Sequence, residues 1–152
     1  MKSNSDNPIK EPIGRRLDKI GKLFLAKLQT NLTHLDIERS FYPLLLIEAG
    51  NGLTQQNLAQ KLNCDKVQVV RIIDYLSSNG YVQRVTHKTD KRKYELVITE
   101  KARVIIPDVR NAFEKTTLLA FKSLSNQQID EFYSIITTIE SNLLTHKSQS
   151  AQ

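Results

Sequence analysis

The sequence has few of the residues on which disulfide scaffolds and metal sites depend. Its 152 residues include one cysteine, no tryptophan and three histidines. A single cysteine excludes an internal disulfide framework and a cysteine-rich zinc site, and it fits a reducing compartment. His34, His87 and His146 are far apart in sequence and lack the spacing of metal ligands, so we expect no metal and no other cofactor.

Long apolar runs are also absent. No uninterrupted apolar segment approaches the roughly 20 residues of a membrane-spanning helix, and the start of the chain, MKSNSDNPIK, lacks the apolar core of a signal peptide. We therefore expect a soluble, cytoplasmic protein that does not enter a membrane. No Ser/His/Asp array, acid pair or glycine-rich phosphate loop is recognisable, so the sequence predicts a protein that is not an enzyme.

The charge is moderately basic. Lys and Arg number 22 against 16 Asp and Glu, which gives a formal net charge of +6. This balance favours a polyanionic partner over an acidic substrate. The length suits one domain, or a small domain with appended helices.

Two short helical patterns meet at residues 63–65 and predict a helix-turn-helix. Thr54 is a typical N-cap for the first helix and Asp65 for the second, and Ser77-Ser78-Asn79-Gly80 is a stop signal for the second. Apolar residues at helical spacing mark the buried faces: Leu58, Ala59 and Leu62, then Val69, Ile72, Ile73 and Leu76.

The other positions of the second helix point away from this predicted core: Lys66, Val67, Gln68, Val70 and Arg71. Two exposed valines are unfavourable in water, whereas in a DNA major groove they can pack on thymine methyl groups. Gln68 can pair with an adenine edge, and Arg71 with a guanine edge or a phosphate. This pattern predicts a helix that contacts DNA bases.

Two β-rich segments, Tyr81–Thr86 and Tyr94–Ile98, follow and predict a hairpin with a basic tip. Such a tip is usually only solvated, but its place after a helix-turn-helix favours DNA contact. The candidate contacts are Arg84, Lys88, Asp90, Lys91, Arg92 and Lys93. We expect Asp90 to hold Arg92 in one orientation through a charge-assisted hydrogen bond, which would favour entry of Arg92 into a minor groove.

An apolar stripe precedes this unit. Its members recur at spacings of three and four: Ile13, Leu17, Ile20, Phe24 and Leu28, with Leu32 continuing the row. The stripe fits a core helix or a helix shared with a partner subunit. The next helix could be capped by Asp36 or Ser40; we favour Ser40, because Pro43 then lies in the first turn.

A long helix is predicted after the hairpin, from Glu100 to about Ser123, with a kink at Pro107. Its apolar positions are Val104, Ile105, Val109, Ala112, Phe113, Leu119 and Ala120. Ser125 and Gln128 form a capping box for a last helix. The apolar stripe of that helix is Ile129, Phe132, Ile136, Ile139 and Leu143.

Several of these residues, taken in order, resemble the MarR-type winged helix-turn-helix transcriptional regulators. They are Leu53-Thr54 with Leu58-Ala59, Arg71, Asp74 and Leu76, Gly80, Arg84, Asp90 with Arg92, Ile98-Thr99-Glu100, and Leu124-Ser125 with Gln128. The resemblance spans about residues 13–144. It implies a mainly α fold with a small β-hairpin wing and N- and C-terminal dimerisation helices. The implied boundaries are a disordered arm at 1–10, a single domain at 11–147 with its winged helix at about 40–101 and dimerisation helices at about 12–34 and 103–146, and a tail at 148–152.

The resemblance also implies a function. It predicts a sequence-specific regulator that binds a pseudo-palindromic operator in double-stranded DNA as a homodimer; we favour a repressor, with an activator as the alternative. A small aromatic or anionic effector near His34 and Tyr42 would release it; a structural histidine and a core tyrosine are the alternative interpretation of these two residues. The chain departs from the family in having His87 where an acidic residue often stands and Lys91 where arginine is common, so the minor-groove role transfers to Arg92 only.

Other interpretations stay open from the sequence. The winged helix could serve as a protein-interaction module, or the protein could bind nucleic acid without sequence preference. Cys64, in the turn between the two helices, is expected to be a small buried residue, with a redox sensor as the alternative. The peroxide sensors of the family use a cysteine in the first helix, and this chain has none there.

Overall fold

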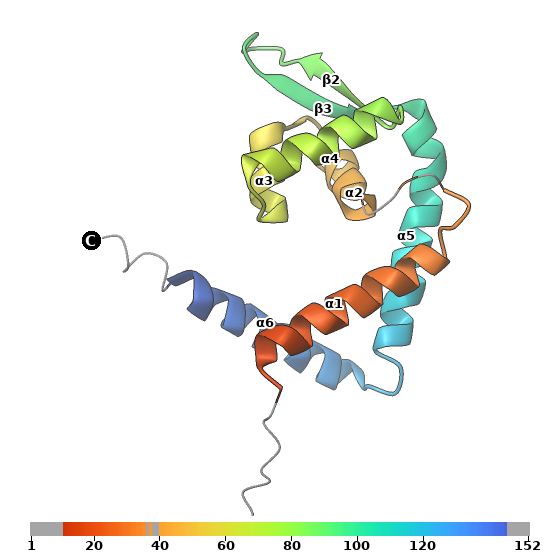
Figure 1. The fold of residues 1–152 in the computed structure, drawn as a ribbon, viewed down its shortest axis with the longest axis vertical. Coiled ribbons are helices and arrows are strands. Elements are labelled where there is room, and N and C mark those ends of the chain that lie inside the picture. The colour runs from red at the N-terminus through yellow and green to blue at the C-terminus, as the bar shows by residue number, and fades with distance from the viewer. Residues whose placement is uncertain (1–10, 36, 38–39, 146–152) are drawn as a thin grey trace, which may run out of the picture. The chain divides into compact units, whose positions relative to one another are not determined.

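The computed structural model describes residues 11–35, 37 and 40–145, and shows helices with one small sheet (Figure 1). The elements in chain order are α1 (Ile13–Thr30), α2 (Phe41–Ala49), β1 (Leu53–Thr54), α3 (Gln55–Leu62), α4 (Lys66–Ser78), β2 (Val82–Thr86), β3 (Tyr94–Ile98), α5 (Glu100–Ala120) and α6 (Asn126–Thr145). The predicted class, mainly α with a small β wing, is confirmed. The chain divides into two compact units, Met1–Thr116 and Thr117–Gln152. The predicted arm at 1–10, the tail at 148–152 and the candidate cap Asp36 lie outside the described residues.

The helix-turn-helix is held by the predicted caps. The Thr54 hydroxyl accepts from the Asn57 backbone N–H at 3.2 Å, and the Asn57 side chain accepts in return from the Thr54 N–H at 3.2 Å. Asp65 accepts from the Gln68 N–H at 2.8 Å, which satisfies an unpaired donor of the first turn of α4. The chain leaves α4 through Gly80, whose φ of +73° is a left-handed conformation that glycine adopts without steric cost.

The sheet is antiparallel, with strand order β1-β3-β2. β2 and β3 form the predicted hairpin, in a register that pairs Val82 with Ile98 and Thr86 with Tyr94. β1 pairs Leu53 with Leu96 on the other edge of β3. The sequence pattern does not predict β1, because a strand of two residues is too short to show alternation.

The core of the first unit lies where α2, α3 and α4 pack against the inner face of the sheet (Figure 1). Residues from α1 to α5 and from both hairpin strands contribute to it, among them Leu28, Leu44, Leu58, Ile73, Leu76, Val82, Leu96 and Val109. Ser40 is the N-cap position of α2 and Pro43 lies in its first turn, as predicted, although Ser40 makes no side-chain capping bond. The helix therefore begins where Pro43 is tolerated.

The buried face of α5 differs from the predicted one. Ala102, Ile106, Val109, Ala112 and Thr116 are buried, whereas Val104 is 77% exposed. Three apolar residues stand together at 104–106, so the helical period alone could not choose which one packs inward. The helix ends at Ala120, short of the predicted Ser123, which has a φ of +72°.

The apolar stripe of α1 is covered at one end only. Leu28 and, just beyond the helix, Leu32 are buried, but Ile13 and Ile20 are exposed. In the second unit, Ser125 and Gln128 form the predicted capping box at the start of α6, with bonds of 2.9 and 3.2 Å. None of the described side chains of α6 is buried.

Candidate nucleic-acid interface

The outer face of α4 carries most of the predicted base contacts. Lys66, Val67, Gln68 and Arg71 are exposed, and Val67 is 60% exposed although its side chain is apolar. The prediction that both valines are exposed is wrong for Val70, which is half-buried. It stands one turn before the fully buried Ile73 and thus at the edge of the packed face.

The tip of the hairpin is a hydrogen-bonded turn that presents basic side chains. The Lys93 N–H donates to the Asp90 carbonyl at 2.9 Å, and the His87 N–H donates to the Lys93 carbonyl at 2.9 Å. Lys88, Lys91 and Arg92 are exposed and make no ion pair among the residues described. They form a cationic edge available to a polyanion.

Asp90 contacts Arg92 in a different way from the predicted one. Its carboxylate accepts from the Arg92 backbone N–H at 3.1 Å rather than from the guanidinium, and its other oxygen lies 3.6 Å from the Lys93 ammonium. A two-residue separation lets an aspartate close a local turn with the backbone, which leaves the arginine side chain outside that contact. Asp90 shapes the tip and does not orient the guanidinium.

Arg84 is engaged within the chain. Its guanidinium donates to the carboxylate of Asp74 at 2.5 Å, which ties β2 to α4. Arg84 is therefore not a free cation like those of the tip. In the sequence Asp74 is only one residue of the family pattern, because nothing in the spacing of Asp74 and Arg84 shows that the turn at Gly80 brings them together.

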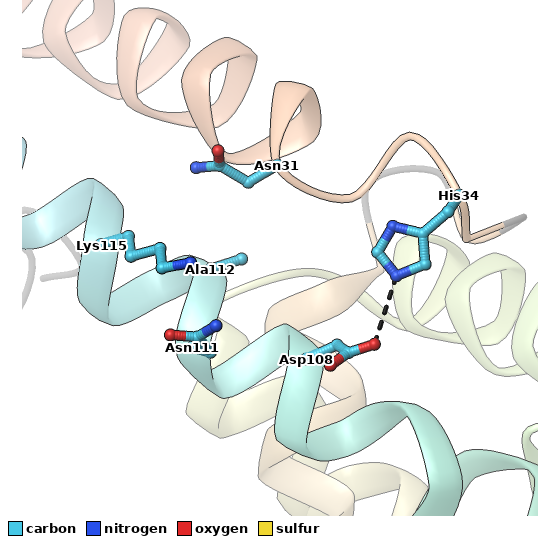
Figure 2. A pocket seen from close by; sticks show the side chains of 6 residues that line it. All are labelled: Asn31, His34, Asp108, Asn111, Ala112 and Lys115. Carbon is cyan, nitrogen blue, oxygen red and sulfur yellow. Dashed lines mark hydrogen bonds and ion pairs between the residues drawn. The ribbon is translucent and has the colours of Figure 1, made fainter.

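A polar pocket of about 240 Å³ lies between the end of α1 and the middle of α5 (Figure 2). His34 contacts Asp108 there, with Nε2 3.2 Å from the carboxylate oxygen. The lining residues are Asn31, His34, Asp108, Asn111, Ala112 and Lys115. Asp108 and Lys115 were not predicted, because they lie more than 70 positions after His34 and only the packing of α5 brings them close.

The structure separates the two predicted ligand residues. Tyr42 does not line this pocket; it is 50% exposed, and its ring centroid lies 6.4 Å from that of Phe113. The interpretation of Tyr42 as a core residue is wrong, since half of the residue faces solvent.

Other chemistry is sparse in the part of the chain that the structure describes. Within residues 11–35, 37 and 40–145, no three His, Cys, Asp or Glu side chains are grouped in a way that could hold a metal ion. None of the helices so described is long and apolar enough to span a membrane. Cys64 is half-buried and packs against the core from the turn between α3 and α4.

Comparison with known proteins identifies the winged helix. The model of the MarR family matches residues 39–94, from the start of α2 to the start of β3. This segment is a MarR-family domain. The MarR fold extends over the rest of the chain as well: a MarR transcriptional regulator from Methanosarcina mazei is 25% identical, with a TM-score of 0.77, over 90% of this chain and 99% of that one.

Two other similar structures hold DNA. A MarR family transcriptional regulator from Listeria monocytogenes, complexed with 26mer DNA, is 21% identical with a TM-score of 0.81, over 92% of this chain and 97% of that one. A mutant MarR from E. coli, complexed with operator DNA, is 22% identical with a TM-score of 0.77, over 84% and 93% of the two chains. The chain has the fold of the MarR-type transcription regulators, with the sheet β1-β3-β2 as its wing.

Proposed function

We propose that this protein is a sequence-specific transcriptional regulator that acts in the cytoplasm and binds double-stranded DNA as a homodimer. The observation that carries the proposal is the outer face of α4. Val67 keeps an apolar side chain in solvent between cationic and amide side chains, and the Asp74–Arg84 ion pair holds the basic wing next to this helix. An apolar residue among Lys66, Gln68 and Arg71 suits a major groove better than water.

The roles of the side chains follow from their chemistry and exposure. Val67, Gln68 and Arg71 would contact base edges, with Val70 at the edge of the contact. Arg92 would enter the minor groove, and Asp90 would keep the tip in shape. The remaining basic side chains would contact the phosphate backbone: Lys66, Arg84, Lys88, Lys91 and Lys93. Arg84 would do so only as part of its pair with Asp74.

Exposed apolar side chains on the terminal helices support a homodimer. α1 exposes Ile13, Ile20 and Leu23, and α6 exposes Tyr133, Ile135, Leu143 and Leu144. Large exposed apolar patches on a protein mark surfaces that a partner covers. A second copy is the partner we infer, with the segments at about 12–34 and 103–146 as dimerisation helices of one domain at 11–147. The dimer would present two α4 helices to half-sites about one turn of DNA apart.

We further infer that the protein is a repressor released by a small aromatic or anionic ligand. The pocket around His34 supports this idea, because Lys115 supplies a cation, and Asn31 and Asn111 supply amides, that could bind a carboxylate. The ligand would contact both the segment after α1 and the middle of α5. It could shift the spacing of the two DNA-binding units only as far as it binds one arrangement more tightly than the other.

A fluorescence-anisotropy titration tests the DNA-binding proposal. Duplexes would be selected from fragmented genomic DNA by the protein, labelled, and titrated at several salt concentrations beside a shuffled control. We expect Arg92→Ala to weaken binding of the selected duplex by about 1 to 3 kcal/mol, and Lys91→Ala chiefly to reduce the salt slope by about 1. Equal affinity for selected and shuffled duplexes would indicate a non-specific binder, and no affinity for either would favour a protein-interaction module.

Light scattering and ligand release test the remaining parts. We expect the mass of a dimer in solution, and Leu23→Glu together with Ile135→Glu should reduce it to that of a monomer, because two charges would be buried in the interface. With benzoate as the first probe, Lys115→Met should weaken release of the duplex. A monomeric wild-type protein, or release that is identical in the variant, would contradict the respective proposal.

A further inference from the structure

The imidazole of His87 lies inside the turn at the tip of the wing. Its Nδ1 accepts from the backbone N–H of Thr89 at 3.3 Å and of Asp90 at 3.2 Å. The Thr89 hydroxyl is 3.1 Å from the same nitrogen. On the other side of the ring, Nε2 lies 3.4 Å from the carboxylate of Glu95 on β3. One side chain thus joins both sides of the tip to the strand below it.

These contacts require one protonation state. A backbone N–H can only donate, so Nδ1 must present its lone pair to Thr89 and Asp90. The ring is then neutral and carries its proton on Nε2, which donates toward Glu95. A proton added to Nδ1 would occupy its lone pair, so the ring N–H would point at the backbone N–H groups of Thr89 and Asp90. Only the Thr89 hydroxyl could still accept from it.

We propose that His87 is a positioning residue for Arg92: neutral His87 closes the wing tip, and protonated His87 opens it. The turn that His87 closes contains Asp90, whose carboxylate binds the backbone of Arg92. Opening the turn releases the backbone from which the arginine projects. The consequence for DNA binding rests on the proposed function, whereas the closure of the tip is a property of the free protein.

The charged groups near the ring come from the strand and from the tip. Glu95 on β3 faces Nε2 of the ring, and the Asp90 carboxylate lies 3.6 Å from the Lys93 ammonium. Glu48, Lys88 and Arg103 line a pocket together with Glu95. A proton on Nδ1 would break its hydrogen bonds to the Thr89 and Asp90 amides, so protonation of the ring and opening of the turn occur together. The contribution of Arg92 to DNA affinity is therefore present while Nδ1 of His87 is unprotonated and is lost when that nitrogen takes up a proton.

Nitrogen NMR of the free protein tests the closure directly. At about pH 8 the His87 ring should show an unprotonated Nδ1 and a protonated Nε2, and the Thr89 and Asp90 amides should shift together with the ring as the pH is lowered to about 5.5. The opposite tautomer, or amides that do not respond while the ring titrates, would overturn the inference. The measurement needs no DNA, so it tests the closure of the tip even if the protein binds no duplex.

The DNA consequence is tested by pairing Arg92→Ala with His87→Asn. Asparagine places its Oδ1 at the same distance along the side chain as Nδ1 of histidine, so it can accept from the same amides at every pH. In wild type, Arg92→Ala should cost roughly fivefold more affinity for the selected duplex at about pH 8 than at about pH 5.5, because bonds worth about 1 kcal/mol hold the tip only at the higher pH. In the His87→Asn background the cost should be the same at both pH values.

Two outcomes of this experiment are decisive in different directions. If both backgrounds show the same change with pH, His87 is not the source, and the inference fails while the proposed function stands. If no duplex is bound selectively, the proposed function fails and the NMR result alone decides whether His87 closes the tip. His87→Ala, which removes the acceptor, should behave at about pH 8 as wild type does at about pH 5.5.

Discussion

Val67 and Val69 offer a matched test of which face of α4 is available to a partner. The two residues are identical and stand two positions apart on one helix, but Val67 is 60% exposed and Val69 is 1% exposed. The same truncation to alanine at each position therefore removes the same atoms from opposite environments. The free energy of unfolding and the affinity for DNA should respond in opposite ways.

The magnitudes follow from burial. Truncating Val69 removes two methyl groups at about 0.8 kcal/mol each and leaves a cavity, so Val69→Ala should lower the free energy of unfolding by about 2 to 3 kcal/mol. At Val67 less than half of the residue is covered, so the same truncation costs roughly 0.6 kcal/mol of burial. The higher helix propensity of alanine offsets most of that cost. Val67→Ala should thus be within about 0.5 kcal/mol of wild type in stability.

DNA affinity should show the reverse order for the folded protein. If Val67 packs on a thymine methyl, Val67→Ala should weaken the selected duplex by about 1 kcal/mol, or roughly fivefold, and a duplex without that thymine much less. Val69→Ala should leave the affinity of the folded fraction unchanged, because its side chain is inside the core.

The assay is urea unfolding followed by far-ultraviolet circular dichroism, because the chain contains no tryptophan. All variants should be compared at one protein concentration, since the stability of a dimer depends on it. Equal destabilisation by the two substitutions would refute the reasoning, because Val67 would then be packed against something in the free protein. Loss of affinity that is uniform across duplexes would instead indicate damage to the fold.

Three further predictions concern the frame around this helix. Asp65→Ala should lower the free energy of unfolding by about 1 kcal/mol in the same assay, because the Gln68 N–H loses its acceptor, and Asp65→Asn should retain most of it; equal loss in both would contradict a capping role. Gly50→Ala should lower stability by about 1 to 3 kcal/mol, because the added methyl group would collide with the Leu53 side chain and lie 2.9 Å from the Leu46 carbonyl; an unchanged thermal midpoint would show that this junction can shift. Cys64, half-buried in its turn, should not act as a sensor: peroxide should leave the DNA affinity of wild type and Cys64→Ser equal, and a loss confined to wild type would reverse that conclusion.

Local signals predicted the elements that depend on neighbouring residues. Thr54, Asp65 and Ser125 were recognisable as caps because an N-cap acts on a backbone N–H three residues away. The hairpin strands followed from β-branched composition, and the stop of α4 from Gly80. The helical period predicted the exposed face of α4, except that it predicted an exposed Val70 where the residue is half-buried.

Contacts between distant residues were decided only by the packed structure. The Asp74–Arg84 pair, the His34–Asp108 contact and the edge strand β1 all require the path of the chain between elements, which no local period contains. For the same reason the sequence showed His87 only as a departure from the family pattern and did not predict the contacts of its ring. The position of its ring nitrogens depends on how the tip turns back onto β3.

The sequence by itself thus determined the helices and the two hairpin strands, the side chains that form the basic surface, and the family to which the winged helix belongs. It could do so because propensity, capping and hydrophobic period act over a few residues. The tertiary structure decided which charged groups are free and which are paired, and that Asp90 and His87 act on the backbone of the tip. Hydrogen bonds and ion pairs form only over a few ångströms, so their partners are settled when the elements pack together.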